Sequence, residues 1–323
     1  MKSYKTKEEL LNHLKVDRHL ELEESLIPAF DMYRYGQIID AYKDILATNI
    51  LSVYKVHVYE PDITLKSFID MMYIDEYFSI KLITYISHYE KVLKKYISDK
   101  VCESMAIRGD TSCCDYSVFE EIKVNISNKV LKCFIPLDKQ YDKDATLVFG
   151  TSYVCESRLR TIDKIIAFSK GKNNHELNYY CGDYFNEKGF LPFYILVGSL
   201  SITNLFVLFE MLTEDLQKDF IRSIHNKKYI EPSDLNTVSY KHFVIRKIRN
   251  IIHHHEPLLP YLCKKGSFGF ETKKSAIKLL RDVYDKCEFS KTIEVNTTVD
   301  FEIVYKLKSK SSKKLAEFIT LLK

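Results

Sequence analysis

The sequence predicts a mainly α-helical protein, and three observations support this prediction. Glycine and proline are scarce in the 323 residues, with 9 and 7 copies, which disfavours a loop-rich β fold. Hydrophobic residues make up 46% and charged residues 28%, a globular composition that excludes disorder as the main state. Several long segments repeat apolar residues every three or four positions, which is the period of an α-helix.

The first third of the chain contains the longest of these segments. Residues 7–15 are predicted to form a short amphipathic helix. Between residues 75 and 101, apolar residues recur on one helix face over several turns, with charged residues between them. The apolar residues are Phe78, Leu82, Ile86, Tyr89, Leu93, Tyr96 and Ile97.

Residues 103–187 are predicted to be a less regular insertion, because the periodic pattern loosens and five of the eight cysteines lie there. One helix is expected within it, from 156 to 170, and Gly171 would end that helix. None of the eight cysteines forms a CxxC pair, and the charged first residues lack the apolar stretch of a signal peptide. We therefore expect a cytoplasmic protein with free thiols.

An uncharged stretch, residues 189–209, has about the length needed to cross a bilayer. It contains Pro192, Gly198 and Asn204, and no second stretch of this kind accompanies it. A helix buried in a protein core is therefore the preferred interpretation, and no membrane partner is expected. Thr213 is a predicted N-cap for the helix that follows.

The last part of the chain is predicted to contain two more helices and a small C-terminal β element. One helix should begin at Ser233 or Asn236 and end near Glu256, where prolines follow, and the other spans 272–287. Residues 293–305 alternate apolar and polar side chains, the pattern of a strand. We expect residues 1–287 to form one helical domain and 288–323 a strand and helix appendage.

The segment 240–260 carries the candidate site. On a helical wheel of about 100° per residue, five polar residues share an arc of roughly 140°. They are Arg246, Arg249, Asn250, His253 and His254. Arginine matches phosphate oxygens with a planar, permanently charged fork, and histidine transfers protons near neutral pH. This combination suits cleavage of RNA, which supplies its own 2′-hydroxyl nucleophile and needs no metal or cofactor.

Residues 249–254, RNIIHH, resemble the signature of HEPN ribonucleases, in which a polar residue follows an arginine and a histidine comes four to six positions later. The wider segment IRNIIHHHEPL is similar to the Arg-Asn-x-x-x-His-His segment of the Abi family of phage abortive-infection proteins, the AbiD/AbiF type. Segments at 4–15, 30–46, 74–101 and 191–220 resemble other parts of that family in its order. The resemblance implies a HEPN-like helical bundle and an antiphage toxin that cleaves RNA without a metal ion.

Carried over to this chain, the resemblance makes Arg249 and His254 the catalytic pair. His255 is the alternative catalytic histidine and His253 a lesser candidate, because a histidine stands at 253 where the family usually has a small residue. Asn250 would orient one of the pair or bind the phosphate.

The resemblance also suggests partners. Arg246, Lys247 and His253 are the residues we expect to bind RNA. HEPN proteins commonly assemble their site from one Arg–His pair of each chain across a two-fold axis, which implies a homodimer here. A structured small RNA, as implied for AbiF-like members, is expected to restrain the activity.

Other interpretations of the same segment remain. The cationic face could belong to a binding protein that holds structured RNA without cutting it, or to an ordinary solvated helix end where the helix dipole favours histidine. The triplet 253–255 could also hold a metal ion in a hydrolase. Consecutive helical residues point about 100° apart, so three of them cannot close on one ion without breaking the helix, and we expect no metal site.

Overall fold

The computed structural model describes residues 5–47, 49–51, 56–127, 151–225, 232–263, 268–286, 301–306 and 310–322. The described chain is mainly α-helical, as the sequence predicts. It divides into two compact units: unit 1 comprises Met1–Ile86 and Phe243–Lys323, and unit 2 comprises Ser87–His242. The helices α4 (Leu65–Ile107) and α12 (Pro232–His253) contribute residues to both units.

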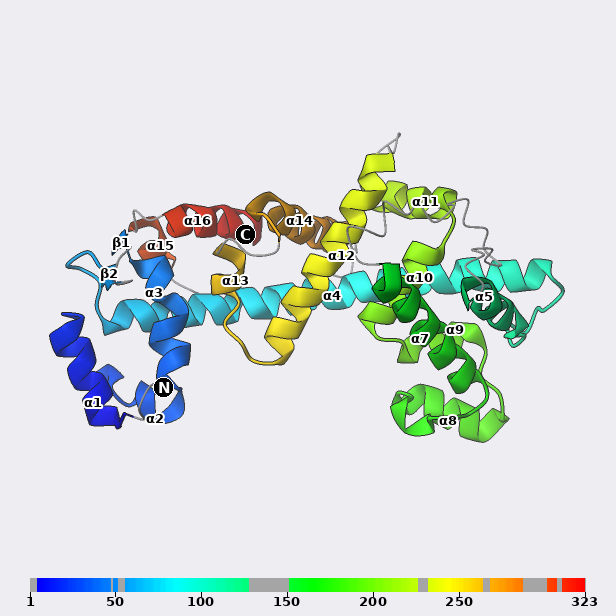
Figure 1. The fold of residues 1–323 in the computed structure, drawn as a ribbon, viewed down its shortest axis with the longest axis horizontal. Coiled ribbons are helices and arrows are strands. Elements are labelled where there is room, and N and C mark those ends of the chain that lie inside the picture. The colour runs from blue at the N-terminus through cyan, green and yellow to red at the C-terminus, as the bar shows by residue number, and fades with distance from the viewer. Residues whose placement is uncertain are drawn as a thin grey trace. The chain divides into compact units, whose positions relative to one another are not determined.

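Unit 1 combines the first half of α4 with short helices from both ends of the chain (Figure 1). Its N-terminal helices are α1 (Lys7–Asn12), α2 (Ala29–Met32) and α3 (Ala41–Leu46). After α12 come α13 (Leu259–Cys263), α14 (Phe270–Lys286), α15 (Glu302–Lys306) and α16 (Lys310–Leu322). The C-terminal helix α16 packs against α3, α13 and α14.

The long helix predicted around residues 75–101 is confirmed as part of α4. In unit 1 its predicted apolar positions Phe78, Leu82 and Ile86 are buried. In unit 2 the next positions of the stripe, Tyr89 and Leu93, are buried as well. One apolar stripe therefore supplies core residues to both units.

The start of the chain agrees with the predicted short helix. Thr6 and Glu9 form a capping box at the first turn of α1, since each side chain accepts a hydrogen bond from the other residue's backbone. The α-helix ends at Asn12, earlier than predicted, and continues as a π-helical turn, His13–Asp17.

The predicted C-terminal β element is wrong for the part that the structure describes. Residues 302–306 form the one-turn helix α15, in which Val304 is buried while Tyr305 is exposed. The remainder of the alternating segment, up to residue 300, lies outside the described residues. An antiparallel pair of strands occurs elsewhere, where β1 (Asn49–Leu51) pairs with β2 (Val56–Val58) and Asn49 lies opposite Val58.

Unit 2 is more regular than the sequence suggests. The described part of residues 103–187 contains α5 (Ser117–Ser127), α7 (Thr151–Ser169) and α8 (Tyr179–Lys188), and α7 packs against α5. The predicted helix end at Gly171 is confirmed, because this glycine has a φ of 66° and its N–H donates to Phe168 O. Thr213 caps α11 (Glu214–His225) as predicted, accepting from Leu216 N at 3.2 Å.

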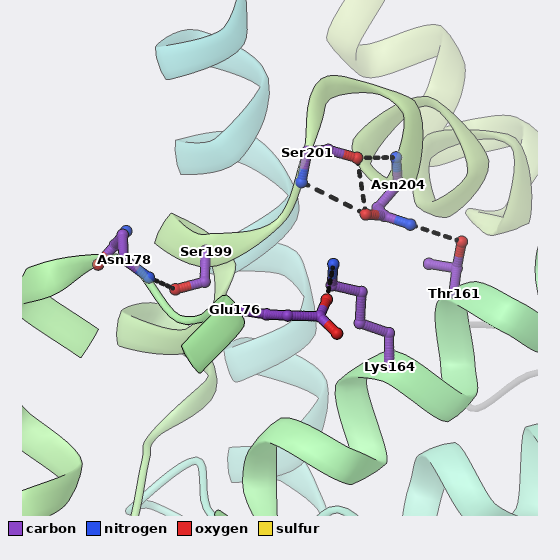
Figure 2. Close-up of polar contacts among 7 residues, drawn as sticks. All are labelled: Thr161, Lys164, Glu176, Asn178, Ser199, Ser201 and Asn204. Atoms are coloured by element: carbon purple, nitrogen blue, oxygen red, sulfur yellow. Dashed lines mark hydrogen bonds and ion pairs between the residues drawn. The ribbon is translucent and has the colours of Figure 1, made fainter. Parts of the chain in front are cut away.

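The apolar stretch 189–209 is not the single helix that its composition predicts. It forms α9 (Phe193–Leu196), a 3₁₀ turn (Val197–Ser199) and α10 (Ile202–Met211). Figure 2 shows why α10 begins anew: Ser201 and Asn204 form a capping box, and Asn204 Nδ2 donates to Thr161 Oγ1 of α7 at 3.1 Å. Local side-chain hydrogen bonds therefore interrupt an apolar run.

Figure 2 also shows that α8 is fixed to the same segment. The backbone N–H of Asn178 donates to Ser199 Oγ at 2.9 Å, and Lys164 pairs with Glu176 at 2.8 Å. These polar groups satisfy one another, so the cluster has a structural role. Within the described ranges, no helix is long and apolar enough to cross a membrane.

Candidate active site at the end of α12

The second half of α12, in unit 1, has the two faces that the sequence predicts. Val244, Ile245, Ile248 and Ile251 are buried, and Ile252 is half-buried. The polar residues lie on the other side, where Arg246, Arg249 and Asn250 are half-buried. Burial of the isoleucine face fixes the rotation of the helix about its axis, and this rotation presents the arginines together.

The residues beyond these arginines are exposed to solvent. Lys247 on the helix and residues 253–256 at its end are all exposed. Among the described residues, the side chains of Arg249, Asn250 and the three histidines have no hydrogen-bond or ion-pair partner. An arginine without a carboxylate partner keeps its donors for an incoming anion, and an exposed imidazole can exchange protons with a bound molecule.

Arg246 is held differently from Arg249. Its guanidinium lies 4.8 Å from the centre of the Phe243 ring, and that ring stacks on Phe268 at 6.4 Å. The cation–π contact restrains Arg246 without using its hydrogen-bond donors. Arg246 therefore presents charge one helical turn before Arg249, along the same face.

The helix ends within the histidine triplet. His253 is its last residue, His254 N donates to Asn250 O at 3.0 Å, and His255 has a φ of 53°. Two further backbone bonds close the end, from His255 N to Ile252 O and from Glu256 N to Ile251 O. This is the Schellman arrangement, which normally places glycine at the position that His255 occupies.

A buried carboxylate binds the chain that follows this turn. Asp75 of α4 is 4% exposed and accepts from Leu258 N at 2.9 Å and from Leu259 N at 3.2 Å. The phenol of Tyr42 also donates to it, at 2.9 Å. Burial raises the pKa of Asp75 to about 6, and the three donors oppose that rise.

The short helix α13, whose first residue is Leu259, is also bound at its C-terminal end. Lys273 Nζ donates to Tyr261 O at 2.6 Å, and Lys314 Nζ donates to Cys263 O at 3.2 Å. A carboxylate at the N-terminus and ammonium groups at the C-terminus both match the helix dipole. α13 is therefore fixed to α4, α14 and α16.

Sequence reasoning did not single out Asp75, although a signal for it exists. Phe68, Met71, Asp75, Phe78 and Leu82 recur at intervals of three or four residues along α4. Asp75 is thus a charged residue on an otherwise apolar and buried helix stripe. Buried carboxylates are rare unless they are paired, so such a position predicts a specific partner.

The structure keeps together the predicted residues of one helix segment, 246–255, and exposes all three histidines. Nowhere in the described ranges do three or more histidine, cysteine, aspartate or glutamate side chains converge in a way that could hold a metal ion. The end of α12 therefore carries two half-buried arginines, one amide and three exposed imidazoles.

Comparison with known proteins gave one family match. The model of the family described as Abi-like protein matches residues 30–259, more than half of the chain. The matched range includes Asp75, Arg249 and the three histidines, and it begins after α1. No curated protein and no solved structure matched the chain.

Proposed function

The chain belongs to the Abi-like family, which is associated with abortive infection as a defence against phage, and on this premise we propose that it is a metal-independent endoribonuclease of HEPN type. The observation that carries the proposal is the solvent-facing end of α12. There Arg249 and Asn250 precede three exposed histidines, and none of these side chains is bonded to another described residue.

The chemistry requires only groups that this helix end contains. A histidine, His254 or His255, removes the proton from a ribose 2′-hydroxyl, and the freed oxygen forms a bond to the adjacent phosphorus. The bond from phosphorus to the 5′-oxygen breaks, and that oxygen takes up a proton from a protonated histidine of the site. Arg249 binds the phosphate oxygens and stabilises the charge that develops on them. The products are a 2′,3′-cyclic phosphate and a 5′-hydroxyl.

The remaining groups assist in binding. Asn250 orients the histidine or bonds the phosphate, while Arg246, Lys247 and His253 contact neighbouring phosphates of the RNA. A single Arg–His pair per chain supports a homodimer in which two copies complete the site. We place the activity in the cytoplasm, restrained by a structured small RNA until infection.

The proposal is tested by assaying RNA cleavage in EDTA with the parent protein and with Arg249→Ala, His254→Ala and His255→Ala. Matched controls are Arg222→Ala and His175→Ala, which change exposed residues of unit 2. We expect the parent and both controls to cleave. Arg249→Ala and one of the two histidine variants should lose activity by about 100-fold or more.

Two results would overturn the proposal. RNA binding by all variants with cleavage by none would identify a binding protein that uses the same cationic face. Cleavage that EDTA abolishes and one divalent ion restores would identify a metal-dependent hydrolase. The molar mass in solution, measured by light scattering, tests the homodimer separately, and a monomeric mass would contradict it.

A further inference from the structure

We propose that Asp75 is a positioning residue for the histidine turn, defined here as residues 254–257, which it fixes through the backbone of Leu258 and Leu259. The inference rests on the proposed function, because it assigns a partner to the same site. Asp75 touches neither RNA nor a histidine. It acts on the geometry of the imidazoles from the other side of the backbone.

Asp75 is surrounded by hydrogen-bond donors. Its Oδ2 atom accepts from Tyr42 Oη, Leu258 N and Leu259 N, and its Oδ1 atom accepts from Leu258 N a second time. Leu258 and Leu259 are both 0% exposed. Without the carboxylate, two buried N–H groups would have no acceptor, so this stretch of chain could not stay where it is.

The histidine turn has a left-handed residue at its centre. His255 has a φ of 53°, a left-handed conformation that costs a residue with a Cβ more free energy than it costs glycine. Two backbone bonds constrain it on the helix side, namely His255 N to Ile252 O at 3.1 Å and Glu256 N to Ile251 O at 3.0 Å. On the other side, only two residues separate His255 from Leu258, whose N–H donates to Asp75.

The helix beyond the turn, α13, is itself fixed in place. The carbonyl end of α13 is bound by Lys273 and Lys314, as described above. The histidine turn is therefore stretched between two fixed elements, the isoleucine face of α12 and the helix α13. Asp75 is the attachment that lies closest to the imidazoles along the chain, and losing it frees the turn at that end.

The choice of residue supports a positioning role over simple packing. An apolar residue at 75 would continue the stripe of α4 and would avoid the cost of burying a carboxylate. It would also leave the turn without its acceptor. The buried carboxylate of Asp75 and the left-handed backbone of His255 are each unfavourable on their own. Both are explained if the imidazoles must be held in one position.

The test compares Asp75→Ala, which removes every acceptor, with Asp75→Asn, whose one oxygen can still accept at the Oδ2 position. Asp70→Ala is the matched control, because it removes a carboxylate of the same helix that pairs with Lys66 at 2.7 Å and takes no part in holding the turn. Hydrogen exchange of the Leu258 and Leu259 amides and the NMR resonances of residues 253–255 report the turn directly. RNA cleavage supplies kcat and KM.

For Asp75→Ala we expect faster exchange at both amides, shifted imidazole resonances and a kcat reduced by about 10- to 100-fold, with KM changed by less than about twofold. Asp75→Asn should recover part of the activity. Asp70→Ala should leave the imidazole resonances and kcat near those of the parent. Unchanged kcat in Asp75→Ala despite faster amide exchange, or an equal loss in Asp70→Ala, would overturn the inference.

A double-mutant cycle with His255→Gly keeps the inference testable if Asp75→Ala folds poorly. With histidine at 255, the freed turn relieves its left-handed strain and offsets part of the lost bonds, whereas glycine has no such strain to relieve. Asp75→Ala should therefore lower the urea midpoint more when residue 255 is glycine. Equal shifts in both backgrounds would show that Asp75 does not act on the turn. The exchange and urea readouts need no ribonuclease activity, so they decide the role of Asp75 even if the parent protein does not cut RNA.

Discussion

The Nε2 atom of His242 lies 2.7 Å from the phenol oxygen of Tyr89, and both residues are buried in unit 2. The imidazole also stacks on Phe206, with ring centres 4.0 Å apart and planes inclined by 3°. Burial lowers the pKa of His242 to about 3, so this histidine is neutral at physiological pH. Seven residues further along α12, Arg249 begins the segment that ends in three exposed histidines.

His242 should make unit 2 sensitive to acid. Its pKa is lower in the folded protein than the ordinary value of 6.5, so the unfolded chain binds more protons between these values. The contribution of the neutral His242 to the free energy of unfolding is therefore fully present above pH 6.5. It is lost as the pH falls toward 3, by up to about 1.4 kcal/mol per pH unit. Urea unfolding between pH 7 and 4 measures this slope, which His242→Phe should reduce.

Asp75 should give stability the opposite dependence on pH. Its pKa is raised from 3.8 to about 6, so the folded protein binds more protons in that window, and stability falls as the pH rises through it. Tyr42 and Cys263, which face Asp75 from α3 and α13, stay neutral there because burial raises the pKa of both. Asp75→Asn should remove this component of the pH dependence of unfolding. If the free energy of unfolding of the variant changed with pH just as that of the parent does, the assignment would be contradicted.

His255→Gly should stabilise the protein even though it removes an imidazole. Relief of the left-handed strain outweighs the entropy that glycine loses on folding, for a net gain of about 0.5 to 1 kcal/mol. The control is His253→Gly, which lies within α12 and should cost about 1 kcal/mol. Chemical denaturation of the two variants shows whether each change raises or lowers the free energy of unfolding. A loss for His255→Gly would mean that the turn relaxes to another conformation in solution.

Gly171 should not tolerate a side chain. A Cβ there would lie 2.3 Å from Cζ of Phe185, and the φ of 66° adds backbone strain. Gly171→Ala should therefore destabilise the protein by about 1 to 3 kcal/mol. Gly182 in α8 has no atom within 4 Å of the corresponding position, so Gly182→Ala should stabilise the helix by about 0.5 to 1 kcal/mol. Thermal unfolding of both variants distinguishes these outcomes.

Periodicity and end signals predicted the helices where local chemistry and burial agree. The stripe of α4 and the two faces of α12 follow from spacing alone, because burial of one face stabilises a helix more than intrinsic propensity does. Gly171 and Thr213 marked helix ends, since a left-handed residue and an N-cap side chain satisfy backbone groups at those positions.

The wrong predictions came from places where another interaction prevailed. Apolar composition at 189–209 predicted one helix, but the capping box of Ser201 and Asn204 begins a new one. The strand prediction rested on alternation over residues 293–305, but residues 302–306 form a helical turn that buries Val304 and exposes Tyr305. The bond between Asp75 and Leu258 joins residues 183 positions apart, so no local pattern could indicate the partner.

The central claim is that the helix end at Arg249 cleaves RNA through its 2′-hydroxyl. Analysis of the product termini after incubation of the purified protein with RNA in EDTA tests this most directly. The account predicts 2′,3′-cyclic phosphate and 5′-hydroxyl ends, which disappear in Arg249→Ala. Intact RNA, or fragments with 3′-hydroxyl and 5′-phosphate ends, would contradict it.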